Sequence, residues 1–214
     1  MFLVARAQFT RDGRQLLTSA VDNTVRQWDI ATGTQLRRFD DTGRSAVLAV
    51  SPDGNLLVTG SNRRAVLLWN LTTESPPTDL VGHSGEITAA AFSPDGTQIV
   101  TGDDDAKCIV WDVATGKRVS RFSRHTRTIT GLAFLPGQSG ANRRILSSSR
   151  DNTVANWDAQ TGKEDPGLVL KHRDEVSRVA LLADGHAVTA CKDNLVRIWD
   201  VASARVIGTV SKQG

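Results

Sequence analysis

The octamer DNTVRQWD (22–29) returns as DNTVANWD (151–158) and again as DNLVRIWD (193–200). All five tryptophans of this 214-residue chain stand in such a context: QWD with Trp28, LWN with Trp69, VWD with Trp111, NWD with Trp157 and IWD with Trp199. Successive tryptophans are separated by 41, 42, 46 and 42 residues, so one unit repeats five times along the chain. A fixed period of this size predicts a repeat architecture in which each unit packs against its neighbours.

Each unit contains the same order of short segments. An apolar run is followed by a turn, which reads SPDG at 51–54 and at 93–96, and then by a second run such as LLVTG or QIVTG. An acidic or amide turn, the segment that ends in tryptophan, a TG turn and a last short run complete the unit. Short β-type runs separated by turns roughly every eight to twelve residues are typical of an antiparallel sheet. We therefore expect four strands per unit, connected as a meander.

These features together resemble the WD-repeat β-propeller family. The WD ending, the pair Gly82 and His83, the SPDG turns and the period all match that family, and the match covers essentially the whole chain. The resemblance implies an all-β fold, a β-propeller of five four-stranded antiparallel blades in a single domain, 1–214. The blades are expected at about 1–40, 41–82, 83–123, 124–171 and 172–214.

How the ring is completed is left open by the sequence. Propellers of this family more often have six to eight blades, and one blade usually takes strands from both ends of the chain. Here the five units run in phase from start to finish. Three interpretations follow: a partial or open ring from a larger propeller, a five-bladed ring closed by side-chain packing, or a ring completed by further repeats or another chain.

Hydroxyl, histidine and aspartate residues recur at fixed distances from tryptophan. A Ser or Thr lies ten residues before each tryptophan, an aspartate lies six before it in four units, and a histidine opens units three to five. This combination suggests a hydrolase triad. However, a nucleophile must be exposed, whereas these hydroxyls lie within apolar strands, and four of the five are threonines. We therefore expect no catalytic residue and no enzyme activity.

The family resemblance gives these residues a structural role, as a hydrogen-bonded tetrad that braces each blade. It implies complete tetrads at His83, Thr101, Asp105 and Trp111; at His125, Ser147, Asp151 and Trp157; and at His172, Thr189, Asp193 and Trp199. Unit two departs from the pattern, since Asp41 and Arg63 stand at its histidine and aspartate positions. An ion pair between them is one hypothesis. Thr59 and Trp69 remain in place there.

Function in such a scaffold is expected in the loops, which carry many basic residues on one rim. The residues of this predicted partner-binding rim are Arg44, Arg63, Arg64, Arg124, Arg127, Arg150, Arg173 and Lys192. They favour a protein or peptide partner, acidic or phosphorylated, against the alternative of a solvated rim of mixed charge. A phosphate or nucleic-acid binder and an enzyme with a central-channel site are the less favoured functions. Nucleic acid is disfavoured because no block of like charge occurs, and the net charge is only +3.

The remaining composition argues against metals, cofactors and membrane spans. Cys108 and Cys191 lie within predicted strands and form no metal-ligand spacing, which favours packed, reduced thiols and a cytoplasmic protein. The run GDDDAK (102–107) lacks the spacing of a calcium loop, so we interpret it as an acidic turn. No apolar stretch is long enough to span a bilayer. We expect a non-catalytic scaffold for protein–protein interaction, without metal or cofactor.

Overall fold

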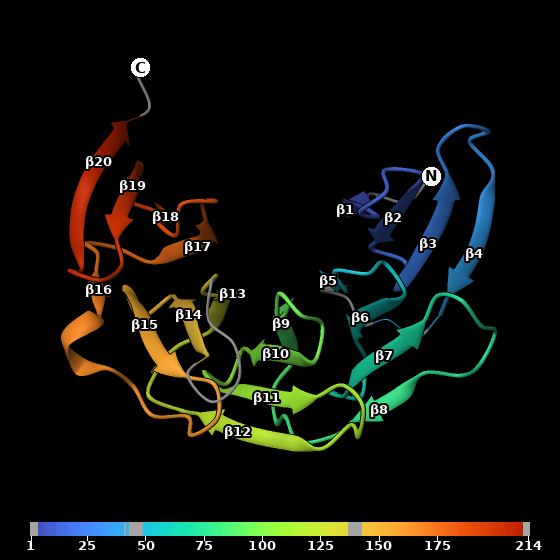
Figure 1. Cartoon of the computed structure of the whole chain (residues 1–214), viewed down its shortest axis with the longest axis horizontal. Helices are drawn as coiled ribbons and strands as arrows, with labels where there is room; N and C mark the ends of the chain where they lie inside the picture. The colour runs from blue at the N-terminus through green and yellow to red at the C-terminus, as the bar shows by residue number, and fades with distance from the viewer. Residues whose placement is uncertain (1–3, 41, 43–48, 137–142, 212–214) are drawn as a thin grey trace. The chain divides into compact units, whose positions relative to one another are not determined.

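The fold was determined from a computed structural model that describes residues 4–40, 42, 49–136 and 143–211. These residues form five sheets of four strands (Figure 1). Within every sheet the strands are hydrogen-bonded in chain order, so each sheet is a meander. The expected all-β fold with five four-stranded antiparallel sheets is confirmed.

The strands are short, as the spacing of the turns predicts. The first sheet contains β1 (Val4–Phe9), β2 (Gln15–Ala20), β3 (Thr24–Asp29) and β4 (Gln35–Phe39), and the second contains β5 (Ala49–Val50), β6 (Leu56–Gly60), β7 (Val66–Asn70) and β8 (Thr78–Leu80). The third contains β9 (Ile87–Phe92), β10 (Gln98–Asp103), β11 (Cys108–Asp112) and β12 (Arg118–Phe122). The fourth contains β13 (Ile129–Phe134), β14 (Arg144–Ser149), β15 (Thr153–Asp158) and β16 (Leu170–Lys171), and the fifth contains β17 (Val176–Leu181), β18 (Ala187–Cys191), β19 (Leu195–Asp200) and β20 (Arg205–Ser211).

The chain divides into two compact units within the third sheet. One unit comprises Met1–Thr101 with Trp111–Lys117, and the other comprises Gly102–Val110 with Arg118–Gly214. The first two sheets therefore belong to one unit and the last two to the other. Among the described residues, helical structure is confined to the 3₁₀ turn η2 (Pro166–Leu168), and no helix has the length and apolar character needed to cross a membrane.

The aspartate of the WD motif closes the turn between the third and fourth strands. Asp158 Oδ1 accepts hydrogen bonds from the amide and hydroxyl of Thr161, at 2.7 and 2.8 Å. Asp29 binds Thr32 and Asp112 binds Thr115 in the same way. A glycine follows each threonine with φ between 66° and 68°, a left-handed conformation that glycine adopts without steric cost. This explains why TG follows WD at a fixed distance in three units.

Neighbouring sheets are joined by apolar side chains from the second, third and fourth strands of each sheet. We call these three residues the apolar trio of the sheet. The trios of the first four sheets are Leu17, Val25 and Phe39; Val58, Val66 and Leu80; Val100, Cys108 and Phe122; and Leu146, Val154 and Leu170. Each of these twelve side chains is at most 1% exposed. Complete burial of an aliphatic or aromatic side chain contributes about 1.5–3 kcal/mol, so these joints supply much of the stabilising apolar burial.

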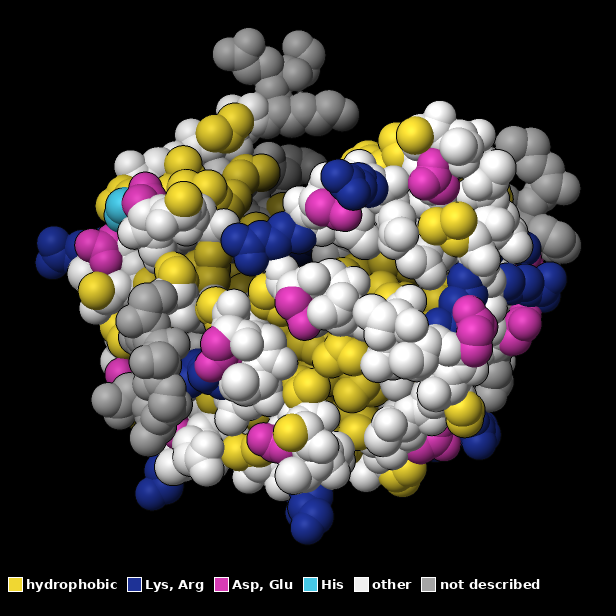
Figure 2. Space-filling view, turned by 45° about the vertical axis from the view of Figure 1, so that its right-hand side comes forward, with side chains coloured by type: hydrophobic (Ala, Val, Ile, Leu, Met, Phe, Trp, Pro, Cys, Tyr) yellow, Lys and Arg dark blue, Asp and Glu magenta, His cyan; other side chains and the backbone are white. Residues whose placement is uncertain are grey.

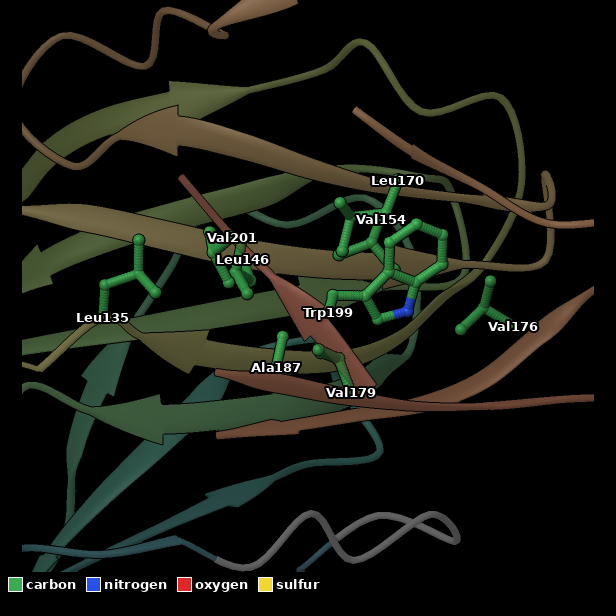
Figure 3. Close-up of a cluster of buried hydrophobic side chains, with 9 residues drawn as sticks. All are labelled: Leu135, Leu146, Val154, Leu170, Val176, Val179, Ala187, Trp199 and Val201. Carbon is green, nitrogen blue, oxygen red and sulfur yellow. The ribbon is translucent and has the colours of Figure 1, made fainter. Parts of the chain in front are cut away.

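In three of these joints the tryptophan of the following sheet packs on the trio. Trp69 meets Phe39 edge to face with ring centroids 5.2 Å apart, and Trp157 stacks on Phe122 at 5.0 Å. Trp199 lies beside Val154 and Leu170 in the cluster shown in Figure 3. The repeated tryptophan is therefore at the centre of these three joints between sheets.

Gly162 and Gly33 occupy equivalent TG turns with φ of 68° and 67°, and they form a matched pair for testing the joint between the third and fourth sheets. A Cβ at Gly162 would overlap the carbonyl oxygen of Arg121, whereas a Cβ at Gly33 would meet nothing within 4 Å. We expect Gly33→Ala to cost about 1–2 kcal/mol from the left-handed backbone alone. Gly162→Ala should cost about 1–3 kcal/mol more, because a backbone atom must move. Urea unfolding followed by tryptophan fluorescence measures both, and equal losses would contradict the close contact.

Candidate functional site

The tryptophan and the hydroxyl ten residues before it are hydrogen-bonded in all five sheets. The indole Nε1 donates to the hydroxyl oxygen in Trp28–Thr18 (2.8 Å), Trp69–Thr59 (3.0 Å), Trp111–Thr101 (2.8 Å), Trp157–Ser147 (3.1 Å) and Trp199–Thr189 (2.8 Å). The spacing of ten follows from the hairpin, which places the third strand beside the second. Four of these hydroxyls belong to residues that are fully buried: Thr59, Thr101, Ser147 and Thr189. A buried hydroxyl that accepts an indole N–H is not placed to attack a substrate.

The fourth sheet contains the complete tetrad. His125 Nδ1 lies 2.7 Å from Asp151 Oδ2, and its Nε2 lies 2.8 Å from Ser147 Oγ, which also accepts from Trp157. Asp151 further accepts from the Thr126 amide and the Thr153 hydroxyl. Burial alone would raise the pKa of Asp151, but the hydrogen bonds from His125 and Thr153 lower it to about 2. This carboxylate stays ionised and holds the loop that enters the sheet.

The third sheet shows three of the expected four residues in contact. His83 Nε2 lies 2.7 Å from Thr101 Oγ1, and Trp111 donates to the same oxygen at 2.8 Å. The Asp105 side chain is 51% exposed, and its carboxylate lies 3.9 Å from Lys107 Nζ. Asp103 in the same acidic turn is fully buried and accepts a hydrogen bond from the Lys107 amide at 2.8 Å. In the described part of the chain no group of three metal-ligating side chains gathers, here or elsewhere.

The expected complete tetrad of the fifth sheet is wrong in one member. His172 Nε2 lies 2.8 Å from Thr189 Oγ1, but Asp193 binds Arg197 at 2.6 and 3.1 Å instead. His172 Nδ1 consequently has no hydrogen-bond partner among the described residues. Burial lowers the pKa of His172, and the charge of Arg197 lowers it further, which favours the neutral ring.

The physical reason for this difference is visible in the repeated octamer. Arg197 lies four residues after Asp193, and its guanidinium reaches the carboxylate within the same hairpin. Arg26 does the same to Asp22 in the first sheet, at 2.7 Å. In the fourth sheet this position holds Ala155, so Asp151 is left to histidine. The aspartates align in the sequence, but the alignment does not show which of them an arginine four residues later binds.

The second sheet keeps the bond between Thr59 and Trp69. The predicted ion pair between Asp41 and Arg63 cannot be followed, because Asp41 lies outside the described residues. The Arg63 guanidinium lies 3.7 Å from Asp79 Oδ2. Both of these side chains are more than 40% exposed, so the pair contributes little to stability.

Three of the predicted rim cations converge on one carboxylate, Glu175. The Glu175 carboxylate lies 2.7 Å from Lys192 Nζ, 3.2 Å from Arg127 Nη1 and 3.9 Å from Arg150 Nε. We call these four residues the Glu175 cluster. The Lys192 ammonium holds the pKa of Glu175 below its usual range, with help from the two guanidinium groups. Glu175, the residue that gathers these cations, is not among the predicted rim residues, because no sequence pattern marks it.

The backbone fixes the loops that carry this cluster. The Lys192 amide donates to the Glu175 carbonyl at 2.9 Å, and the Arg150 amide donates to the Thr128 carbonyl at 3.0 Å. Ser149 Oγ donates to the Arg127 carbonyl at 2.9 Å. The Glu175 side chain is only 20% exposed, whereas the three cations are 56–63% exposed. The cluster therefore presents its positive groups to solvent from an anchored base.

The other predicted rim residues do not join this cluster. Arg124 pairs with Glu164 at 3.7 Å, and the Arg173 side chain is exposed. Arg63 and Arg64 belong to the other unit, and Arg44 lies outside the described residues. On the face shown in Figure 2, basic and acidic side chains are interspersed. Convergence on Glu175 thus distinguishes Arg127, Arg150 and Lys192 from this mixed surface.

Comparisons with known proteins agree with the repeat. The family model described as "WD domain, G-beta repeat" matches residues 4–29, 33–70, 74–112, 116–158 and 165–200. The nuclear distribution protein nudF of Aspergillus niger is 27% identical over 99% of this chain and 42% of its own length. An uncharacterized WD repeat-containing protein of Schizosaccharomyces pombe is 26% identical over 92% of this chain and 54% of its own. The SIR4-interacting protein SIF2 of Saccharomyces cerevisiae is 23% identical over 92% of this chain and 31% of its own length. The chain spans about half the length of the first two relatives or less.

Removing the charge of Asp151 tests the tetrad of the fourth sheet. Asp151→Asn should lower the free energy of unfolding by about 1–3 kcal/mol, because the buried His125 ring loses its charged partner. Asp40→Asn makes the same chemical change at an exposed carboxylate that pairs with Arg38, and it should change stability by about 0.5 kcal/mol or less. Urea unfolding gives both values. Equal effects of the two substitutions would show that the tetrad does not stabilise this sheet.

Lowering the pH should remove the stabilisation that the ionised Asp151 carboxylate contributes. The pKa of Asp151 is about 2 in the fold, below its ordinary value of 3.8 in the unfolded chain. Ionised Asp151 therefore stabilises the fold above about pH 4, and this contribution is lost as the pH falls towards 2. Urea midpoints of the parent chain should fall over this range. The fall should be smaller for Asp151→Asn, and parallel curves would contradict the assignment.

Proposed function

This chain belongs to the WD40 repeat family, and we propose that it is an interaction scaffold that binds an acidic or phosphorylated protein segment at the Glu175 cluster. WD repeat relatives imply a protein-interaction scaffold in general. The name of the yeast relative SIF2 states an interaction with another protein, SIR4, which supports the same general role here.

The observation that carries the proposal is the imbalance of charge in the cluster. Arg127, Arg150 and Lys192 face a single carboxylate, which leaves two positive charges in excess. The neighbouring Arg173 and Asp174 are both exposed and offset each other. A second anion brought to this surface would therefore meet an unneutralised positive site.

Arginine favours carboxylate or phosphate as the ligand group. A guanidinium offers parallel N–H donors that match two oxygens of either anion, and charge-assisted hydrogen bonds are the stronger class. The present ion pairs are largely solvent-exposed, and such pairs contribute only about 0–1 kcal/mol. Little is lost when Arg127 or Arg150 turns from Glu175 towards an incoming anion.

The fixed loops lower the cost of binding. Their backbones are already hydrogen-bonded to one another and to Ser149 at the end of β14, so association has to order only the cationic side chains. Glu175 keeps the three cations near one another while no partner is bound. The tetrad of the fourth sheet supports this arrangement from within the sheet and does not contact the ligand.

We further propose a reducing compartment such as the cytoplasm. Cys108 and Cys191 are both buried free cysteines. Burial raises the pKa of the Cys108 thiol, which keeps it protonated and unreactive. Mass spectrometry of the protein isolated under thiol-blocking conditions tests this, and mixed disulfides at either residue would contradict it.

Charge reversal tests the proposed binding surface. The probe is a fluorescein-labelled glycine and glutamate decapeptide with one phosphoserine, and its serine and all-lysine counterparts are compared by fluorescence anisotropy. Arg127→Glu with Arg150→Glu should weaken binding of the phosphopeptide at least about tenfold, because two charge-assisted contacts become repulsive. The serine peptide separates recognition of phosphate from recognition of carboxylates.

The matched control carries the same change of charge on the opposite rim. Lys117→Glu with Lys163→Glu alters exposed lysines in TG turns, at the other ends of the strands, and should leave the affinity within about twofold at moderate salt. Equal losses in the two double variants would indicate a general effect of net charge. Equal binding of the lysine peptide would reject an anion-selective surface.

A further inference from the structure

Two side chains of the fifth sheet can bind the Asp193 carboxylate. Arg197 binds it in this structure, with contacts of 2.6 and 3.1 Å. The other is His172, whose Nε2 lies 2.8 Å from Thr189 Oγ1 and whose Nδ1 is buried without a hydrogen-bond partner among the described residues. A buried polar atom without a partner destabilises the fold. A carboxylate at His172 Nδ1 would remove this cost.

The fourth and first sheets show the two arrangements of this aspartate separately. In the fourth sheet Asp151 Oδ2 lies 2.7 Å from His125 Nδ1, and alanine stands four residues after the aspartate. In the first sheet Asp22 binds Arg26 at 2.7 Å, and residues 1–82 contain no histidine. The fifth sheet contains both the arginine and the histidine. Its aspartate therefore has two partners where each of the others has one.

The protonation state of His172 decides which partner is favoured. While the ring is neutral, the charged guanidinium is the stronger partner for a carboxylate. Burial lowers the pKa of His172 and the charge of Arg197 lowers it further, so the neutral ring prevails at neutral pH. A protonated ring would place an uncompensated charge at the buried Nδ1, which costs far more than an ion pair within one hairpin contributes. Protonation therefore reverses the preference.

We propose that Asp193 is a proton-driven switch, bound to Arg197 while His172 is neutral and bound to His172 Nδ1 once that ring is protonated. The acid arrangement is the complete tetrad that the fourth sheet already contains. Transfer of one carboxylate oxygen is sufficient, since Asp151 uses only Oδ2 for the histidine ring. His172 begins the loop that carries Glu175, so the switch acts on that loop, independently of any partner of the Glu175 cluster.

The groups that face the His172 ring come from three elements. β19 contributes the Arg197 guanidinium, the turn before β19 contributes Asp193, and the fourth sheet contributes backbone groups of Leu170 and Asn152. The other charged or titratable side chains of these loops are exposed, as Arg173 and Asp174 are, or held elsewhere: Glu175 by Lys192 at 2.7 Å, Asp151 by His125 at 2.7 Å and the Cys191 thiol by the Asp174 carbonyl at 3.1 Å. Asp193 is therefore the carboxylate that a protonated ring can bind.

Nuclear magnetic resonance of the histidine ring protons in the parent chain tests the switch directly. His125 is the internal reference, because its Nδ1 already lies on a carboxylate. At pH 7.5 His172 should lack the strongly deshielded Nδ1 proton that hydrogen bonding to a carboxylate produces. Such a proton should appear as the ring is protonated, below the ordinary histidine value of 6.5. Its absence from the fully protonated ring would overturn the proposal.

Arg197→Gln removes the competing charge and should complete the tetrad without acid. The pKa of His172 should rise above 6.5, and the deshielded Nδ1 proton should be present at pH 7.5. Adding Asp193→Asn should return the pKa of His172 below 6.5, because burial then acts on the ring without a carboxylate. Arg197→Ala, which copies the alanine of the fourth sheet, repeats the test with a side chain that cannot bind Asp193. Equal His172 pKa values with and without Asp193→Asn would show that Asp193 does not move, against the proposal.

Arg26→Gln is the matched control, since it removes the same ion pair from a sheet without a histidine. It should lower the urea midpoint at pH 7.5, because Asp22 has no ring to bind, and it should leave the titration of His172 unchanged. Arg197→Gln should lower the midpoint less, because Asp193 gains His172 as a partner. Equal falls in the two variants would contradict this compensation.

Discussion

The indole rings of Trp69, Trp157 and Trp199 each make two kinds of contact, one within their own sheet and one with the preceding sheet. Each N–H donates to a Ser or Thr of the neighbouring strand, in Trp157 to Ser147 at 3.1 Å, while the ring packs on the preceding sheet, here on Phe122. A buried N–H without a partner would cost about 1–3 kcal/mol, so the hydroxyl must be present wherever the ring is buried. One residue therefore fixes the hairpin and the joint between sheets together.

Because the tryptophans hold the strands and sheets together, the rim loops are available for recognition. The tetrad of the fourth sheet uses His125 and Asp151 to hold the entering loop, and the same loop carries Arg127 outward to Glu175. A change at the cation would leave the hydrogen bonds of the tetrad intact. The scaffold can thus hold its strands constant and vary the charges on its rim, which suits a protein whose role lies in binding.

The sequence predicted the repeat, the strands and the pairing of tryptophan with hydroxyl, because all three depend on local spacing. It did not predict that Arg197 takes Asp193 from His172, since an alignment compares positions and cannot weigh two side chains that compete for one carboxylate. It also predicted Arg127, Arg150 and Lys192 as rim residues but not Glu175, the glutamate that gathers them. Their convergence depends on the packing of two sheets, which spacing along the chain does not encode.

The same limit applies to the apolar faces. Val196 and Val210 have the residue types and register of the buried trios, so the sequence alone gives no sign that they are 36% and 59% exposed. A surface meant for water would be expected to carry polar residues at these positions, and their apolar character indicates a face built to be covered. Attraction at the Glu175 cluster weakens as salt screens its charges, whereas the burial of apolar side chains between sheets is not weakened by screening.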